Sequence, residues 1–194
     1  MDSLRFTNKP IVLIEWNFDW LFPDINIKNK PGKDKFDRAT EQQKFLELVK
    51  MRSQGKIDLI ISIMAIESFK RRHKHDKNLV EKVISYLKEN TTCVEHVLFE
   101  GSETDIKVKR AEKLLYATGE KQDDPLVYTL IYFIDPQVTH MVTFDVKLYK
   151  DKSKQYKNIL QKDKELREWI DCRRKVIGPP SKIIEDVENT FFKD

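Results

Sequence analysis

Three short apolar runs separated by segments of helical pattern constrain the fold of this chain more than any other feature. They lie at 11–14, 57–62 and 138–143 and are rich in β-branched residues. A short apolar run without polar alternation is typical of a strand buried on both faces. Because strands alternate with helices, we expect a three-layer α/β/α fold with a central, mostly parallel sheet of four to five strands.

The segments between these runs carry helix signals. Over 40–53, Thr40 is the expected N-cap, Gln43 occupies the capping-box position, and Gly55 ends the helix. The pattern predicts a short edge strand of the sheet at 94–99 and a last short strand at 176–177. Further helices are expected through Glu67 and over 79–87, 106–117, 124–135, 150–174 and 183–192.

Length and composition predict one domain. The 194 residues are 40% hydrophobic and 35% charged, and the lysine-rich helical segment at about 150–174 is interpreted as an insertion in that single domain, 1–194. No apolar run approaches the roughly 20 residues that a membrane span requires. The two cysteines form no CxxC pair, so we expect a cytoplasmic protein with free thiols and no membrane partner.

Acidic residues stand beside the apolar runs. Glu15 directly follows the first run, Glu67 lies on the helix leaving the second, Asp123 and Asp124 open a later helix, and Asp145 follows the third run. The carboxyl ends of parallel strands meet at one edge of a sheet, where ligands bind. Carboxylates gathered there repel one another unless a cation neutralises them, and their oxygens suit Mg²⁺ or Mn²⁺. This placement predicts a metal-dependent phosphodiesterase, most simply a nuclease.

Each acid taken singly also has a structural explanation. Asp124 precedes Pro125 and suits a helix N-cap, Glu67 suits an exposed helix face, and Asp145 suits a turn. Glu15 is the hardest to explain in this way, because an acid directly after a buried strand needs a partner. The metal-site hypothesis therefore rests on the joint placement of the acids.

A basic block follows Glu67 on the same predicted helix. Lys70, Arg71 and Arg72 are candidates for binding the phosphates of a nucleic acid, and a solvated helix face is the structural alternative. Candidate base-stacking or core-packing aromatics are Trp16, Trp20 and Phe144.

The order of these motifs resembles that of the PIN-domain nucleases, over nearly the whole chain. The resemblance implies a PIN-like fold, hydrolysis of single-stranded RNA, and a Mg²⁺ or Mn²⁺ cofactor. The matching elements are Ile11-Val12-Leu13-Ile14-Glu15-Trp16-Asn17, Ser62 with Glu67, Asp123-Asp124, Val142-Thr143-Phe144-Asp145 and Val176-Ile177-Gly178-Pro179-Pro180.

The family's site residues map onto this chain as follows. Glu15, Glu67, Asp124 and Asp145 match its acids and metal ligands, with Asp123 as the alternative to Asp124; Asn17 matches a polar companion, and Thr143 matches the hydroxyl of a Thr-x-Asp element.

The resemblance also implies partners and an alternative. Toxin–antitoxin ribonucleases belong to this family, so an antitoxin or other protein partner and a homodimer are expected partners besides RNA. The family usually has aspartate where this chain has Glu15. The extra methylene moves the carboxylate outward, and Mg²⁺ demands near-ideal geometry. The second hypothesis is therefore a catalytically weak PIN-like module that binds RNA or a protein partner.

Overall fold

The computed structural model describes the sheet, its main helices and a few separate positions. The side chains of Trp20 and Met64 are not among what it describes. The described residues are 9–15, 18–22, 37–94, 106, 109–110, 113, 138–144, 162–164 and 176–192.

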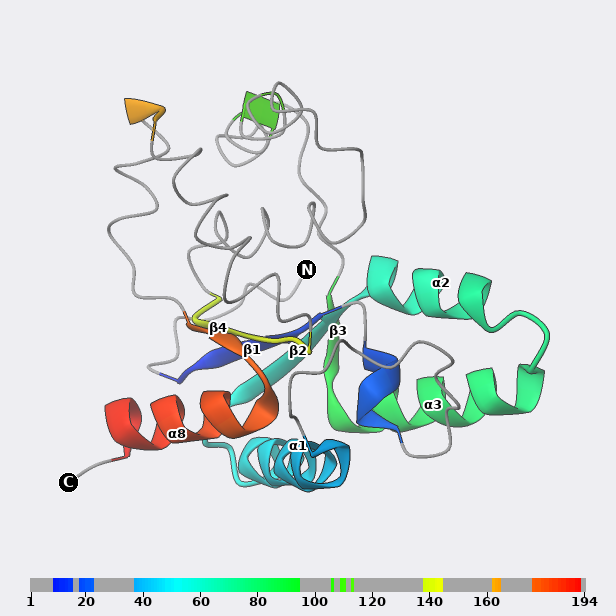
Figure 1. Cartoon of the computed structure of the whole chain (residues 1–194), viewed down its shortest axis with the longest axis horizontal. Helices are drawn as coiled ribbons and strands as arrows, with labels where there is room; N and C mark the ends of the chain where they lie inside the picture. Colours follow the sequence, from blue (N-terminus) through cyan, green and yellow to red (C-terminus); the bar gives the residue numbers. More distant parts are fainter. Residues whose placement is uncertain are drawn as a thin grey trace.

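The strands form one five-stranded sheet in which all pairings are parallel (Figure 1). Their order is β3-β2-β1-β4-β5, so β1 is central, β2 and β3 lie on one side of it, and β4 and β5 lie on the other. The strands are β1 (Ile11–Ile14), β2 (Asp58–Ser62), β3 (Thr92–Val94), β4 (His140–Val142) and β5 (Val176–Gly178).

Both faces of the sheet are buried. Val12 and Ile14 of β1 belong to one apolar cluster, and Leu13 between them belongs to a second cluster on the opposite face. All three side chains are at most 1% exposed. Alternate residues of a strand point to opposite faces, so burial of consecutive residues requires cover on both sides. The sheet with its flanking helices thus confirms the predicted three-layer α/β/α class.

Helices follow the strands in the predicted order. α1 and α8 lie side by side against one face of the sheet, while α2 and α3 extend toward the other end of the molecule (Figure 1). Phe45 and Leu48 of α1, at most 2% exposed, pack into the same cluster as β1, and burying such a side chain contributes about 1.5–3 kcal/mol. The helical elements are η1 (Phe18–Leu21), α1 (Arg38–Ser53), α2 (Ile63–Arg72), α3 (Lys77–Asn90) and α8 (Pro180–Phe191).

The predicted N-cap of α1 was wrong by three residues. Asp37, not Thr40, caps the helix: its Oδ1 accepts from the backbone N–H of Ala39 at 3.1 Å, and its Oδ2 accepts from Thr40 Oγ1 at 2.6 Å. These bonds, the one from Thr40 first, lower the pKa of the Asp37 carboxyl. The residue expected to cap instead supports the cap. Gly55, at φ +70°, follows the end of α1 as predicted.

Two polar contacts hold α8 in place. The buried Glu41 of α1 accepts hydrogen bonds from the backbone N–H of Ser181 at 2.9 Å and from its hydroxyl at 2.6 Å, and so caps the first turn of α8. On β4, the buried His140 bonds through Nε2 to Asp186 Oδ2 at 3.2 Å. These contacts and the apolar cluster fix the last helix against α1 and the sheet.

Several predicted boundaries shift. The edge strand lies at Thr92–Val94 rather than 94–99, of which only Val94 is described, and the last helix begins at Pro180 rather than Ile183 because Pro suits the first helical position. The helices expected over 106–117, 124–135 and 150–174 lie mostly or wholly outside the described residues. Within the described part of the chain, no helix has the length and apolar character to cross a membrane.

Candidate active site

Glu15 lies at the carboxyl end of the central strand. It directly follows β1, and its backbone N–H donates to the carbonyl of Val142 on β4 at 3.1 Å. Its side chain is only 2% exposed, because Glu15 extends the buried strand β1 by one residue. A carboxyl group is thus fixed at the sheet edge where parallel α/β folds bind ligands.

Thr143 joins this carboxylate to the neighbouring strand. Its backbone N–H donates to the carbonyl of Gly178 on β5 at 2.8 Å, and its hydroxyl donates to Glu15 Oε2 at 2.6 Å. Thr143 is 1% exposed, and so is Ser62 at the end of β2. The backbone pairing aims the hydroxyl at Glu15, although the two residues are 128 positions apart.

The Glu15–Thr143 bond crosses the topological switch point of the sheet. From β1 the chain builds outward through β2 and β3, then adds β4 on the other side of β1. Connections on the two sides of such a point diverge, and the crevice between them is the usual ligand site of open α/β sheets. Glu15 and Thr143, each expected at the carboxyl ends of the strands, are therefore in direct contact there.

The space beside Glu15 is closed. Apolar side chains of Ile14, Phe18, Leu21, Val142 and Phe144 surround the carboxylate and Thr143, and the hollow has no room for a water molecule. A cation or substrate does not fit into this hollow unless some of these side chains move. Phe144 is 7% exposed and packs in the core, so in this arrangement it offers no stacking surface for a base.

Glu67 has a different environment. It lies on the face of α2 opposite to Ala65, Ile66 and Phe69, which enter the core, and half of its side chain is exposed. Its Oε1 lies 2.6 Å from Lys70 Nζ. Glu67 therefore lies on a helix, as predicted. Its position on an exposed face of that helix agrees with the structural explanation given for this acid.

The remaining predicted site residues are one amide and three acids. Asn17, Asp123, Asp124 and Asp145 lie outside the described residues. Among the residues that are described, no group of three or more His, Cys, Asp or Glu is arranged to hold a metal ion. Within that part of the chain, the predicted ligand set is represented by Glu15 and Glu67. The described donors at the sheet edge are carboxylate and hydroxyl oxygens, which are the hard ligands that Mg²⁺ and Mn²⁺ prefer.

The predicted basic block lies at the end of α2, and its members differ in their contacts. Lys70, Arg71 and Arg72 are all exposed. Arg72 is bound internally, since its guanidinium lies 2.6 Å from Asp19 Oδ1, while His73 Nε2 lies 2.9 Å from Asp19 Oδ2. Sequence reasoning missed Asp19, an acid on η1 whose partners are 53 and 54 residues away.

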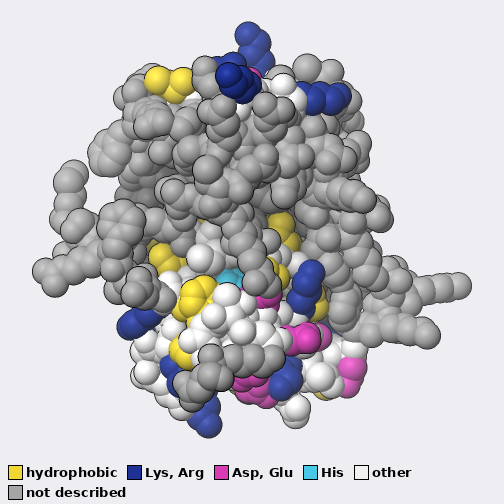
Figure 2. All heavy atoms as spheres, turned by 90° about the vertical axis from the view of Figure 1, so that its left-hand side faces the viewer, with side chains coloured by type: hydrophobic (Ala, Val, Ile, Leu, Met, Phe, Trp, Pro, Cys, Tyr) yellow, Lys and Arg dark blue, Asp and Glu magenta, His cyan; other side chains and the backbone are white. Residues whose placement is uncertain are grey.

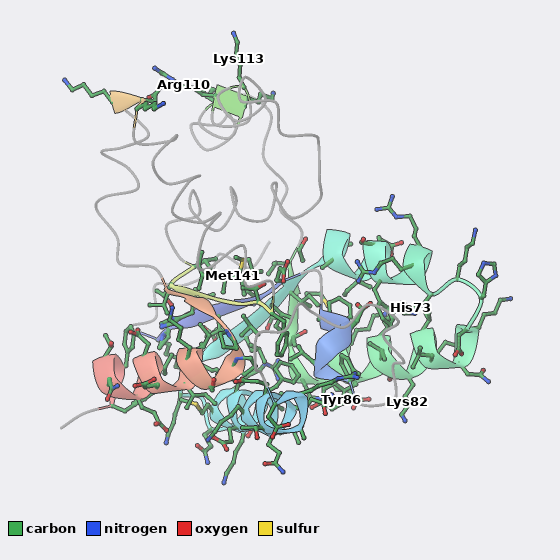
Figure 3. All side chains as sticks on the ribbon, viewed as in Figure 1. His73, Lys82, Tyr86, Arg110, Lys113 and Met141 are labelled. Carbon is green, nitrogen blue, oxygen red and sulfur yellow. The ribbon has the colours of Figure 1, made fainter. Side chains whose placement is uncertain are left out.

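A larger groove lies between α1, η1 and α3. It has a volume of about 470 Å³ and is lined mainly by apolar side chains, with Tyr86 and Lys82 of α3 on its wall (Figure 3). Burial raises the pKa of the Tyr86 phenol. The described lining of this groove contains no acid, so it lacks the carboxylates that hold a catalytic cation in a nuclease site of the predicted kind. Its residues are Leu21, Phe22, Ala39, Gln42, Gln43, Phe45, Leu46, Leu79, Lys82, Val83 and Tyr86.

Neither a protein-family model nor any curated protein matches this chain.

Proposed function

We propose that this protein is a metal-dependent endoribonuclease of the PIN type that hydrolyses phosphodiester bonds of single-stranded RNA. One observation carries the proposal: a buried carboxylate at the end of the central strand is hydrogen-bonded, across the switch point, to a hydroxyl from the next strand. A purely structural acid gains little from burial at this edge, because desolvation of a carboxylate is unfavourable.

Each site residue has a proposed role. Glu15, Asp124 or Asp123, and Asp145 hold Mg²⁺ or Mn²⁺, and Glu67 completes the site or orients water, for which its exposed carboxylate is accessible. When bound, the metal supplies charge stabilisation and an activated water for phosphodiester hydrolysis. Thr143 fixes the rotamer of Glu15 through the 2.6 Å bond and so pre-organises one ligand oxygen.

The closed hollow favours a second candidate function. Apolar side chains wall the Glu15 carboxylate, and glutamate stands where related nucleases use aspartate. A catalytically weak PIN-like module that binds RNA or a protein partner, such as an antitoxin, is consistent with both features. In that case the Glu15–Thr143 bond is structural.

A cleavage assay separates these functions. End-labelled single-stranded RNA and DNA are incubated with wild type, Glu15→Gln and Asp145→Asn in Mg²⁺, Mn²⁺ or EDTA. The ribonuclease proposal expects cleavage of RNA that EDTA abolishes and that each substitution reduces by about 100-fold or more, in line with removal of a group that acts on the transition state. Cleavage in EDTA, or a variant as active as wild type, refutes the proposal. RNA binding by wild type without cleavage supports the second function.

A further inference from the structure

The end of α2 and the turn after it concentrate positive charge. The segment 70–77, named here the basic tip, contains five Lys or Arg residues and one Asp, which gives it a formal charge of +4. The whole chain also has a net charge of +4, so the rest of the chain is neutral on balance. The basic tip lies at the end of the molecule farthest from α8 (Figure 1).

The opposite side of the molecule differs. On the face that carries α8, positive and negative side chains are interspersed (Figure 2). Exposed residues of α8 include Lys182, Glu185 and Glu188. The excess of positive charge is therefore local to the basic tip and is not found on the face that carries α8.

Internal contacts divide the tip into two sets. Arg72 and His73 are held by the two carboxylate oxygens of Asp19, and Lys70 pairs with Glu67. Asp76 caps α3 by accepting from the backbone N–H of Leu79 at 3.0 Å, so the one acid of the tip is used at a helix start. These contacts fix the shape of the turn and occupy its acid.

The second set faces solvent. The side chains of Arg71, Lys74 and Lys77 are exposed and form no hydrogen bond or ion pair within the described part of the chain. In Figure 3, nitrogen-tipped side chains of this turn project outward, whereas His73 points back toward η1. Three cations on a turn braced by Asp19 form a preorganised surface for a polyanion.

We propose that Arg71, Lys74 and Lys77 bind the phosphates of a single-stranded RNA that extends from the sheet edge. The inference deepens the proposed function and depends on it for the nature of the polyanion. α2 starts at the carboxyl end of β2 and its ten residues span about 15 Å. A strand with the duplex rise of about 3.4 Å per nucleotide covers that length with about four or five nucleotides, and a more extended single strand covers it with fewer. An RNA bound at the sheet edge thus reaches the tip within a few nucleotides.

The surroundings of the tip favour RNA over an anionic membrane. The apolar residues of α2 and α3, such as Phe69 and Val83, enter the core. Among the described residues, the large exposed hydrophobic side chains lie elsewhere, at Leu46, Ile106, Phe191 and Phe192. In the described part of the tip and its two helices, no large exposed apolar side chain accompanies the cations, as membrane insertion would require.

The test is equilibrium binding of a fluorescent single-stranded RNA of about 12 nucleotides, long enough to span the roughly 15 Å to the tip. Binding is measured in EDTA, so that cleavage does not interfere. The tip variant is Arg71→Gln/Lys74→Gln/Lys77→Gln. The control, Lys9→Gln/Lys50→Gln/Lys88→Gln, removes the same charge from exposed positions outside the tip: before β1, on α1 and in the last turn of α3. Urea unfolding of both variants checks that the fold is kept.

Counterion release sets the expected size of the effect. At about 0.1 M salt each phosphate contact contributes about fivefold to the binding constant, so the tip variant binds about 100-fold more weakly than wild type. The slope of log K against log salt falls by about 2 in magnitude. The control variant loses much less.

The possible results separate the two proposals. Equal losses in the tip and control variants overturn the inference, as does tip-dependent binding to anionic vesicles without binding to RNA. If wild type cleaves RNA but the tip variant binds like wild type, the inference fails and the ribonuclease proposal stands. If the tip variant loses binding but wild type cleaves nothing, the inference stands and the catalytic proposal fails.

Discussion

Replacing Thr143 by valine tests whether the Glu15 carboxylate depends on its hydroxyl partner. The substitution keeps the shape of the side chain and removes the donor of the 2.6 Å bond to Glu15 Oε2. Both side chains are at most 2% exposed, so bulk water cannot replace the lost donor without rearrangement.

The size of the effect follows from the nature of the bond. A hydrogen bond to a charged group contributes about 1.5–3 kcal/mol to stability, against about 0.5–1.5 kcal/mol for a neutral one. Thr143→Val should therefore lower the free energy of unfolding by about 1.5–3 kcal/mol. For a domain of this length that corresponds to a fall in Tm of about 3–12 °C. In a Glu15→Gln background the same substitution should have the smaller, neutral effect.

Urea unfolding of the four proteins in this double-mutant cycle measures the coupling directly. Thr143→Ser, which keeps the hydroxyl, should retain most of the stability. Thr190→Val is the matched control, because Thr190 is exposed and its hydroxyl lies 3.4 Å from Asp186, so a change within about 0.5 kcal/mol is expected. If Thr143→Val is no more destabilising than this control, the hydroxyl does not stabilise Glu15 and the reasoning is refuted.

Three further predictions concern the metal, α8 and the start of α1. Mg²⁺ or Mn²⁺ at about 100 times its dissociation constant should stabilise wild type by about 2.7 kcal/mol in calorimetry, and Glu15→Gln far less; an unchanged wild-type Tm contradicts the metal site. Glu41→Ala should cost about 1–3 kcal/mol because it leaves the backbone N–H and hydroxyl of Ser181 without their acceptor, with Glu41→Gln as the milder control; equal stability of the two variants in urea would count against the cap. The Asp37 pKa is lowered mainly by the Thr40 hydroxyl, so this cap stabilises the fold above the carboxyl's unfolded-state pKa and loses its effect as pH falls through the folded-state pKa. Asp37→Ala should accordingly lower the urea midpoint at neutral pH, with a difference from wild type that shrinks in acid; a constant difference would contradict this role.

The strands were predictable because their apolar runs have to be buried wherever they lie. Ile11–Ile14 matched its strand in full, β2, β4 and β5 differ from the predicted bounds by one or two residues at an end, and β3 begins two residues before the predicted start. The cap of α1 was missed because Asp37 and Thr40 both suit an N-cap, and only the folded backbone shows whose oxygen meets the N–H of Ala39.

The candidate site was predictable only in part. An acid after a buried strand identified Glu15, and the strand pattern placed Thr143 at the same sheet edge. The Asp19 bridge to Arg72 and His73 carried no sequence signal, since its partners come from a helix more than 50 residues later. That bridge separates the braced residues of the basic block from the solvent-facing ones, which residue type alone cannot do.

Local chemistry in the sequence determined the fold class, because the spacing of apolar residues decides which segments become buried strands and which become helices. It also determined that an acid would end the central strand. Only the tertiary structure decided the partners: that Thr143 bonds to Glu15, that Glu41 caps α8, and that Asp19 holds Arg72. Hydrogen bonds and ion pairs depend on distances of about 3 Å between atoms far apart in the chain, and those distances are set by how the elements pack.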